Sequence, residues 1–278
     1  MKKQLAFAGK AGKAAALGLY LIFMVFPLYW MVITSLKPRN EIFTLPLQYW
    51  PERISFENYI QIFKISKFHI YIGNSLIVSL TSAAVVLVVT VLSGYVLARF
   101  TFRGSKQLMI AFFVTQMVPL FIGFSTLYLM MSRMGLLNKQ GSLILMYTVG
   151  LVPFCTIMLR GFFQRIPASL EEAAMVDGCS RLGALFRVIV PVMMPGISAT
   201  FIFAFVQNWN ELFMAIMFID KESSKTLPVA MNSFITKFDI DWGSMSAATV
   251  LSIVPTVILF AICQRFIVEG LTQGAVKG

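Results

Sequence analysis

Long apolar runs separated by short polar segments dominate this sequence. Six runs of about 20 or more residues carry no charge, and each is long enough to cross a hydrocarbon layer of roughly 30 Å as an α-helix. Too little polar chain remains to cover such runs inside a soluble fold. The pattern therefore predicts an all-α membrane protein with six transmembrane helices in one domain, residues 1–278. The predicted spans are residues 14–36, 70–98, 107–132, 140–159, 188–218 and 242–264.

Composition supports the membrane class. Hydrophobic residues make up 58% of the 278 residues and charged residues only 13%, and the mean hydropathy is +0.80. The first run is too long for the apolar part of a signal peptide and is not followed by a cleavage pattern, so we expect it to remain as the first span.

The net charge of +11 indicates membrane topology. With both termini in the cytosol, about 13 Lys and Arg residues fall on inside segments and about 10 on outside segments of similar total length. The segment 99–106 is the clearest case, with three basic residues in eight. No basic soluble face is present, so the charge does not indicate nucleic-acid binding.

Four prolines occur near the middle of predicted spans: Pro119, Pro153, Pro195 and Pro255. Proline frees a backbone carbonyl and bends a helix, which is common where helices surround a polar path. A bend that only improves packing explains any one of them equally well.

The stretch SLEEAAMVDGCS has the signals of a short soluble helix. Ser169 with Glu172 three residues later has the spacing of a capping box, and Glu171 and Glu172 lie at the positive end of the helix dipole. Gly178 is expected to end the helix with positive φ, and Ser180 to cap a second helix that runs into the fifth span. The pattern predicts a helix over about 169–178, outside the membrane.

Two interpretations of this helix remain open from the residues alone. Ala173 and Ala174 leave one face flat, so that another protein can approach closely. Alternatively, the segment is an amphipathic connector on the lipid surface, although such a connector usually carries basic and large apolar residues instead of two acids.

The same residues resemble the signature loop of the permeases of ABC importers. Glu172-Ala173-Ala174, three residues, Gly178 and nine residues lead to Val188-Ile189-Val190-Pro191. The family pattern has Ile and Leu where this chain has Val188 and Val190. The resemblance implies that residues 169–178 form the coupling helix, with Glu171, Glu172, Ala173, Ala174 and Gly178 as the residues that couple to an ATPase.

The resemblance continues along nearly the whole chain and is closest to the carbohydrate, maltose-type group. It rests on SLKPRNEIF, NSLIVS, GYVLARFTFRG, LRGFFQRIPASLEEAAMVDG, NWNELFMA, TLPV and QRFIVEGLTQGAVKG. It implies the type I importer permease fold, with five core helices and one peripheral helix, in a prokaryotic cytoplasmic membrane. The implied partners are a second homologous permease, a cytosolic ATPase dimer, an extracytoplasmic sugar-binding protein and a mono- or oligosaccharide.

A polar cluster, Gln207-Asn208-Trp209-Asn210-Glu211, lies in the outer half of the fifth span. Sugars bind to amides, carboxylates and flat aromatic faces, and an ionisable group at membrane depth usually faces a cavity or a partner. We expect Asn208, Trp209, Asn210 and Glu211 to border the substrate path, with Asn208 and Glu211 on the path-facing side. Helix-to-helix packing is the alternative role for each of these residues.

Catalytic and cofactor motifs are not found. Gly9-Lys10-Ala11-Gly12-Lys13 superficially resembles a phosphate loop, but Ala14 stands where Ser or Thr is needed and no strand precedes it. His69 is the single histidine and the three cysteines are far apart, so no metal site, cofactor or intramembrane protease is expected. We therefore expect a transport component that hydrolyses no ATP itself, and the rival is a passive facilitator or channel for a small polar solute.

Overall fold

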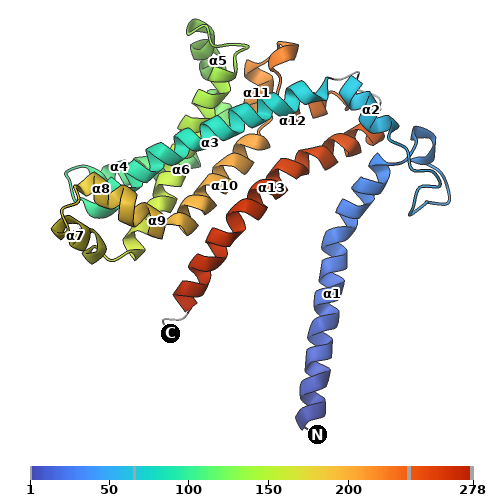
Figure 1. Cartoon of the computed structure of the whole chain (residues 1–278). Coiled ribbons are helices and arrows are strands. Elements are labelled where there is room, and N and C mark those ends of the chain that lie inside the picture. The colour runs from blue at the N-terminus through green and yellow to red at the C-terminus, as the bar shows by residue number, and fades with distance from the viewer. Residues whose placement is uncertain (1, 65–66, 237–238, 276–278) are drawn as a thin grey trace. The chain divides into compact units, whose positions relative to one another are not determined.

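The structure, a computed structural model, describes residues 2–64, 67–236 and 239–275, and within them it is built of helices. These residues contain no β-strand, although Ile235 and Ile240 form an isolated bridge. The predicted all-α class is confirmed, and Figure 1 shows the helices along the chain. The α-helices are α1 (Lys2–Ser35), α2 (Glu57–Lys64), α3 (Phe68–Arg99), α4 (Ser105–Met117), α5 (Phe124–Arg133), α6 (Gln140–Arg165), α7 (Ser169–Val176), α8 (Arg181–Ala184), α9 (Val190–Val192), α10 (Met194–Trp209), α11 (Phe213–Phe218), α12 (Leu227–Asn232) and α13 (Trp242–Ala275).

Within the described residues, four helical stretches are long and apolar enough to cross a membrane. They are Gly12–Ser35, Phe68–Arg99, Gln140–Arg165 and Trp242–Phe266. A fifth candidate is a bent pair of helical segments, Arg181–Val192 and Met194–Trp209. Many residues of α3 are β-branched and disfavour helices in water, but a backbone in lipid must satisfy its hydrogen bonds within the segment.

The predicted span 107–132 is not one continuous helix, which corrects the sequence-based prediction. α4 ends at Met117, Val118 is extended (φ −81°, ψ 118°), and α5 begins only at Phe124 after the 3₁₀ turn Leu120–Gly123. Pro119 explains the interruption, because it lacks an amide hydrogen and its ring disfavours a helical residue before it.

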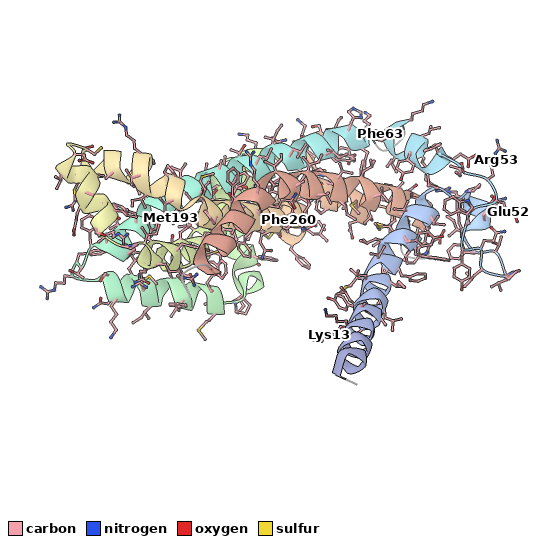
Figure 2. The ribbon with its side chains drawn as sticks, turned by 60° about the horizontal axis from the view of Figure 1, so that its bottom comes forward. Lys13, Glu52, Arg53, Phe63, Met193 and Phe260 are labelled. Carbon is pink, nitrogen blue, oxygen red and sulfur yellow. The ribbon has the colours of Figure 1, made fainter. Side chains whose placement is uncertain are left out.

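The predicted span 188–218 is also interrupted. The segment Arg181–Val192, which contains the π-helical turn Leu185–Ile189, meets α10 at an angle of 80°. Figure 2 labels Met193 at this bend. Pro195 lies in the first turn of α10, where proline favours a helix start over a continuation. The helix capped by Ser180 therefore does not run straight into the fifth span.

The other two prolines leave their helices intact. Pro153 lies inside α6 and Pro255 inside α13. The proline pattern alone therefore did not distinguish a tolerated proline from one that ends a helix.

The chain divides into two compact units, which are described separately. The first contains Met1–His69 and Ala230–Val254, and the second contains Ile70–Val229 and Pro255–Gly278. In the first unit the apolar window of α1 is only 6% buried, as suits a helix surrounded by lipid or another chain.

Polar side chains organise the loop that follows α1 in the first unit. Lys37 is 2% exposed, donates from Nζ to the Gln48 carbonyl oxygen at 2.6 Å, and lies 5.0 Å from the ring centroid of Trp30. Asn58 donates from Nδ2 to the carbonyl oxygens of Ser35 and Lys37 at 3.0 and 2.9 Å. The buried amino and amide groups of Lys37 and Asn58 are thus paired, as burial favours, whereas Glu41 Oε2 and Gln48 Oε1 in the same loop are buried without a hydrogen-bond partner in the described part of the chain.

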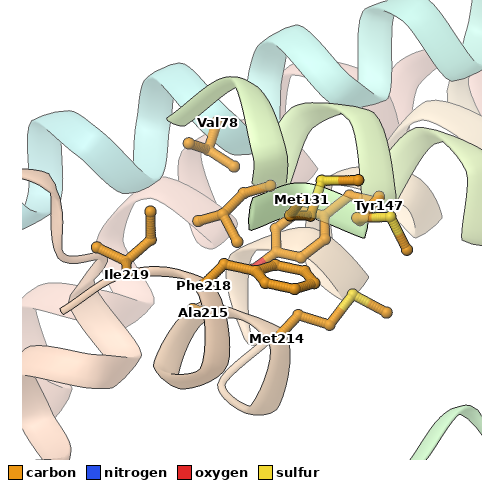
Figure 3. Packing of buried hydrophobic residues seen from close by; sticks show 9 residues of the cluster. Val78, Met131, Tyr147, Met214, Ala215, Phe218 and Ile219 are labelled. Carbon is orange, nitrogen blue, oxygen red and sulfur yellow. The ribbon is translucent and has the colours of Figure 1, made fainter. Parts of the chain in front are cut away.

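Among the described residues of the second unit, one hydrophobic cluster joins α3, α5, α6 and α11, and another joins α3, α6, the turn Leu185–Ile189 and α10. The first, shown in Figure 3, surrounds Tyr147 and Phe218. The other surrounds Leu159, Phe163 and Ile197. α6 and α10 approach so closely that a Cβ atom on Gly196 would lie 2.6 Å from the Phe162 ring.

Candidate functional site

The element between α6 and α8 has the expected outline. α7 covers Ser169–Val176, Gly178 follows with φ +88°, and the Ser180 hydroxyl accepts a hydrogen bond from the Gly183 amide at 3.1 Å. The glycine stop and the serine cap are therefore confirmed.

The predicted capping box is not formed. Ala168 occupies the N-cap position with helical φ and ψ (−64°, −25°), and no side chain caps the helix there. The Leu170 amide already donates to the Pro167 carbonyl oxygen at 3.3 Å. The chain thus turns helical one residue earlier than expected, so Ser169 lies inside the first turn and is not positioned to cap it.

The two neighbouring carboxylates of α7 have opposite environments. Glu171 and Ala174 face the protein and are 7% and 8% exposed. Glu172 and Ala173 are exposed, and so is Val176, at 87%. Of the residues predicted to couple to an ATPase, the outer face of α7 therefore presents Glu172 and Ala173 but not Glu171 or Ala174.

Glu171 is held by the end of α3. Its Oε1 accepts from Arg99 Nε at 2.6 Å, and its Oε2 accepts from the Tyr95 hydroxyl at 3.1 Å. Arg99 Nη2 also donates to the Ile166 carbonyl oxygen at 2.9 Å. Sequence reasoning missed these two partners of Glu171. Membrane topology alone was enough to explain the basic residue Arg99, and no sequence signal links Tyr95 to Glu171.

The polar cluster of the fifth predicted span lies where α10 ends. Asn208 is 6% exposed and donates from Nδ2 to the Ser82 hydroxyl at 2.8 Å, which in turn donates to the Val78 carbonyl oxygen at 2.6 Å. Trp209 is 2% exposed and its ring stacks on Phe205 at a centroid distance of 5.5 Å. Both side chains are therefore buried, and Asn208 links α10 to α3.

Glu211 lies in the break between α10 and α11. Its carboxylate accepts from the amides of Met214 and Ala215 at 2.8 and 3.1 Å, and from the Tyr147 hydroxyl at 2.7 Å. It therefore caps the start of α11, where a negative charge is favourable.

The exposed polar side chains of this cluster are Gln207 and Asn210. Asn210 donates from Nδ2 to the Val206 carbonyl oxygen at 2.9 Å. The side chains expected to face the path, Asn208 and Glu211, thus have partners inside the chain, and the exposed pair is the neighbouring one, three residues apart.

A second polar network joins the opposite end of α3 to the segment 220–227. Asn74 donates from Nδ2 to the carbonyl oxygens of Ser223 and Lys225 at 3.0 and 2.8 Å and accepts from Gln140 at 2.7 Å. The Ser75 hydroxyl accepts from the Leu227 amide at 2.7 Å. Asn74 and Ser75 therefore fix this segment to α3.

The described part of the chain contains neither a cluster of metal-ligating side chains nor a phosphate-binding loop at residues 9–13. No group of three or more His, Cys, Asp or Glu side chains is gathered there. Residues 9–13, with their glycines and lysines, lie within the helix α1 and do not form a loop after a strand.

Comparison with known proteins decides the family. Residues 90–273 match the family described as binding-protein-dependent transport system inner membrane component. The chain belongs to this family. The matched region begins within α3 and includes α7, the break after α10 and nearly all of α13.

Related permeases match this inner membrane component along nearly their whole length. The sulfoquinovosyl glycerol transport system permease protein SmoH of Agrobacterium fabrum is 38% identical, over 98% of this chain and 95% of its own. The diacetylchitobiose uptake system permease protein DasC of Streptomyces coelicolor is 38% identical, over 92% of each. The trehalose/maltose transport system permease protein MalG of Thermococcus litoralis is 31% identical, over 94% of each.

A solved structure supports the fold. The crystal structure of a bacterial ABC transporter involved in the import of alginate contains a chain with a TM-score of 0.79 and 21% identity, with 92% of this chain and 95% of that chain covered. The permease therefore has the fold of an ABC importer component. Because the family comprises the membrane components of transport systems, ATP is hydrolysed by a separate subunit.

Proposed function

We propose that this permease forms half of the translocation path of an ATP-driven, binding-protein-dependent sugar importer. The observation that carries the proposal is family membership together with relatives named for saccharide transport, each aligned over more than nine-tenths of this chain. The other half of the path is a second homologous permease. A cytosolic ATPase dimer supplies the energy, and an extracytoplasmic binding protein delivers the sugar.

α7 is the coupling helix in this proposal. Its exposed face carries Glu172, Ala173 and Val176, so that a carboxylate, a small residue and an apolar side chain are free to enter a groove on another protein. Gly178 then turns the chain back toward the membrane. A connector resting on lipid would instead point basic residues toward the headgroups.

The proposed topology has six crossings with both termini in the cytosol. α4, the turn Leu120–Gly123 and α5 together make the third crossing, since α4 alone would span only about 20 Å. The fifth crossing consists of α10, the break at residues 210–212 and α11.

The segment 207–211 borders the sugar path. Gln207 and Asn210 offer exposed amides to sugar hydroxyls, and the backbone around the break adds polar groups that a continuous helix would hide. Asn208, Trp209 and Glu211 contribute by fixing the geometry of the break from behind.

The decisive experiment reconstitutes the four components in proteoliposomes with a panel of labelled mono- and disaccharides. We expect uptake of one saccharide class that requires ATP on the ATPase side and the binding protein on the other. Glu172→Lys is the matched variant, because it reverses the charge on the exposed face of α7 and should abolish the stimulation of ATP hydrolysis. Sugar uptake by the permease without ATP would instead identify a passive facilitator.

A further inference from the structure

A buried ion pair joins the last residue of α3 to the first turn of α7. We propose that Arg99 and Glu171 form a latch that positions α7 on α3, so that Glu171 acts inside the permease and is not a contact for the ATPase. This inference rests on the proposed role of α7 as the coupling helix. It assigns the two adjacent glutamates different tasks, with Glu171 holding the helix and Glu172 facing the partner.

The geometry of the latch is specific. Arg99 Nε lies 2.6 Å from Glu171 Oε1, and the side chains of the two residues are only 12% and 9% exposed. The same guanidinium donates from Nη2 to the Ile166 carbonyl oxygen, directly after α6. One arginine thus ties α7 to the ends of both α3 and α6.

The Glu171 carboxylate has partners inside the chain and is not available to bind another protein. Its second carboxylate oxygen accepts from Tyr95, so both oxygens are already used inside the chain. Arg181 is the other cation that lines the small pocket beside this carboxylate, and its guanidinium lies 5.0 Å from the ring centroid of Phe100. Glu172 also lines this pocket but is exposed.

α7 needs such an anchor for physical reasons. It has eight residues, fewer than an isolated helix requires to be stable in water. A short helix transmits a push from an ATPase only if it is fixed to a longer element, and α3 has 32 residues. A buried ion pair also makes the position of α7 selective, because separating the two charges leaves each unpaired in a poorly solvated site.

The test uses the full complex and four variants of the permease. Glu171→Gln and Arg99→Gln each leave one buried partner unmatched, the double variant removes both charges, and Glu171→Arg with Arg99→Glu exchanges them. Arg103→Gln is the matched control, since Arg103 is an exposed arginine four residues after Arg99. We expect each single variant to lower the binding-protein-stimulated rate of ATP hydrolysis about tenfold, and the double and exchanged variants to recover part of it.

A second measurement follows the position of α7 without any ATPase. Cys179 lies just after α7 and is partly exposed, whereas Cys155 and Cys263 are buried. In membranes containing the full chain, we expect Glu171→Gln and Arg99→Gln each to increase the rate of maleimide labelling of Cys179 about tenfold. Without the ion pair, α7 separates from α3 more often, and Cys179 is then more accessible to the reagent. The control should label at nearly the wild-type rate. The exchanged variant should label at a rate between those of the single variants and the wild type, because a carboxylate at position 99 cannot donate to the Ile166 carbonyl oxygen.

The outcomes separate the latch from the proposed function. Wild-type labelling of Cys179 and wild-type stimulation in both single variants would overturn the latch. A wild-type permease that recruits no ATPase would refute the coupling role, yet the labelling experiment would still test the latch. Failure of the exchanged pair to improve on the single variants in labelling would show that general packing, not the ion pair, holds α7.

Discussion

At the scale of single residues, identical side chains take different roles according to the direction in which a helix turns them. Glu171 and Glu172 are adjacent, but one is buried beside an arginine and the other is exposed. Successive helical residues are rotated by about 100°, so two neighbours rarely share a face. A sequence motif that contains both therefore does not state which one meets a partner.

Gly178 gives the first prediction. Its φ of +88° is costly for a residue with a Cβ atom, while the space around it is open, so the penalty is conformational and not steric. We expect Gly178→Val to destabilise the turn by about 1–2 kcal/mol, and Gly178→Asn by less, because asparagine tolerates this region. Binding-protein-stimulated ATP hydrolysis should fall in the same order. Gly161→Ala, also in open space but without positive φ, is the control; equal effects of Val and Asn at position 178 would contradict the argument.

The cluster at the end of α10 gives the second prediction. Asn208→Ala removes the buried donor to the Ser82 hydroxyl and should lower the free energy of unfolding by about 1 kcal/mol. Gln207→Ala removes only an exposed amide and should leave stability unchanged while weakening sugar transport. Thermal melting of the purified complex and initial uptake rates separate the two effects. Unchanged transport in Gln207→Ala and Asn210→Ala together would place the sugar contacts elsewhere.

At the scale of elements, hydropathy located the helices well but not their interruptions. The sequence-based spans agree with α3, α6 and α13 because an apolar run of sufficient length leaves the backbone no alternative to a helix in lipid. The breaks near Pro119, Met193 and Asn210 depend on the φ and ψ angles of a few residues, which hydropathy does not report. Pro153 and Pro255 show that proline alone does not fix them, since neighbouring helices decide whether a freed carbonyl is tolerated.

The surroundings of α7 show which features of a helix end can be predicted from sequence and which cannot. Gly178 and Ser180 were predictable because their roles depend only on local backbone geometry. The latch between α3 and α7 was not, since Arg99 and Glu171 are far apart in sequence and only the packing of α3 brings them together. Long-range partners of polar residues therefore need the fold, whereas turn residues do not.

The contact of α3 with the segment 220–227 gives the third prediction. Asn74 is 8% exposed and makes three hydrogen bonds that join this segment and Gln140 to α3. Asn74→Ala should leave two carbonyl groups without their donor, at a cost of about 1–3 kcal/mol, and should loosen the segment. Trypsin cleavage at Lys221 or Lys225 should then become faster in intact cells. Asn210→Ala, an exposed amide elsewhere, is the control, and an unchanged cleavage rate in Asn74→Ala would show that other contacts suffice.

At the scale of the second unit, α3 holds a different polar segment at each of its ends. Its first turns hold the segment 220–227 through Asn74 and Ser75, and its last turns hold α7 through Tyr95 and Arg99. Figure 1 shows α3 running past α6 and α10 between these ends. A helix of 32 residues is about 48 Å long, enough to reach from one side of a bilayer to the other. A displacement of α7 therefore has a direct mechanical route to the opposite end of the unit.

Sidedness of the whole chain gives the last prediction, and it tests the six-crossing topology. Cys179 follows α7 and should react with a membrane-impermeant maleimide only from the cytosolic side, in cells that produce the permease without its ATPase. The variant Cys179→Ser/Ser223→Cys moves the reactive thiol to position 223, an exposed position of the segment 220–227, where it should react only from outside. Cys155 and Cys263 are buried and provide the background, measured in Cys179→Ser alone. Labelling of both thiols from the same side would mean an even number of crossings between α7 and this segment. In that case α10 and α11 would not cross the membrane together. The six-crossing topology, which places α7 on the side opposite the binding protein, would then be wrong.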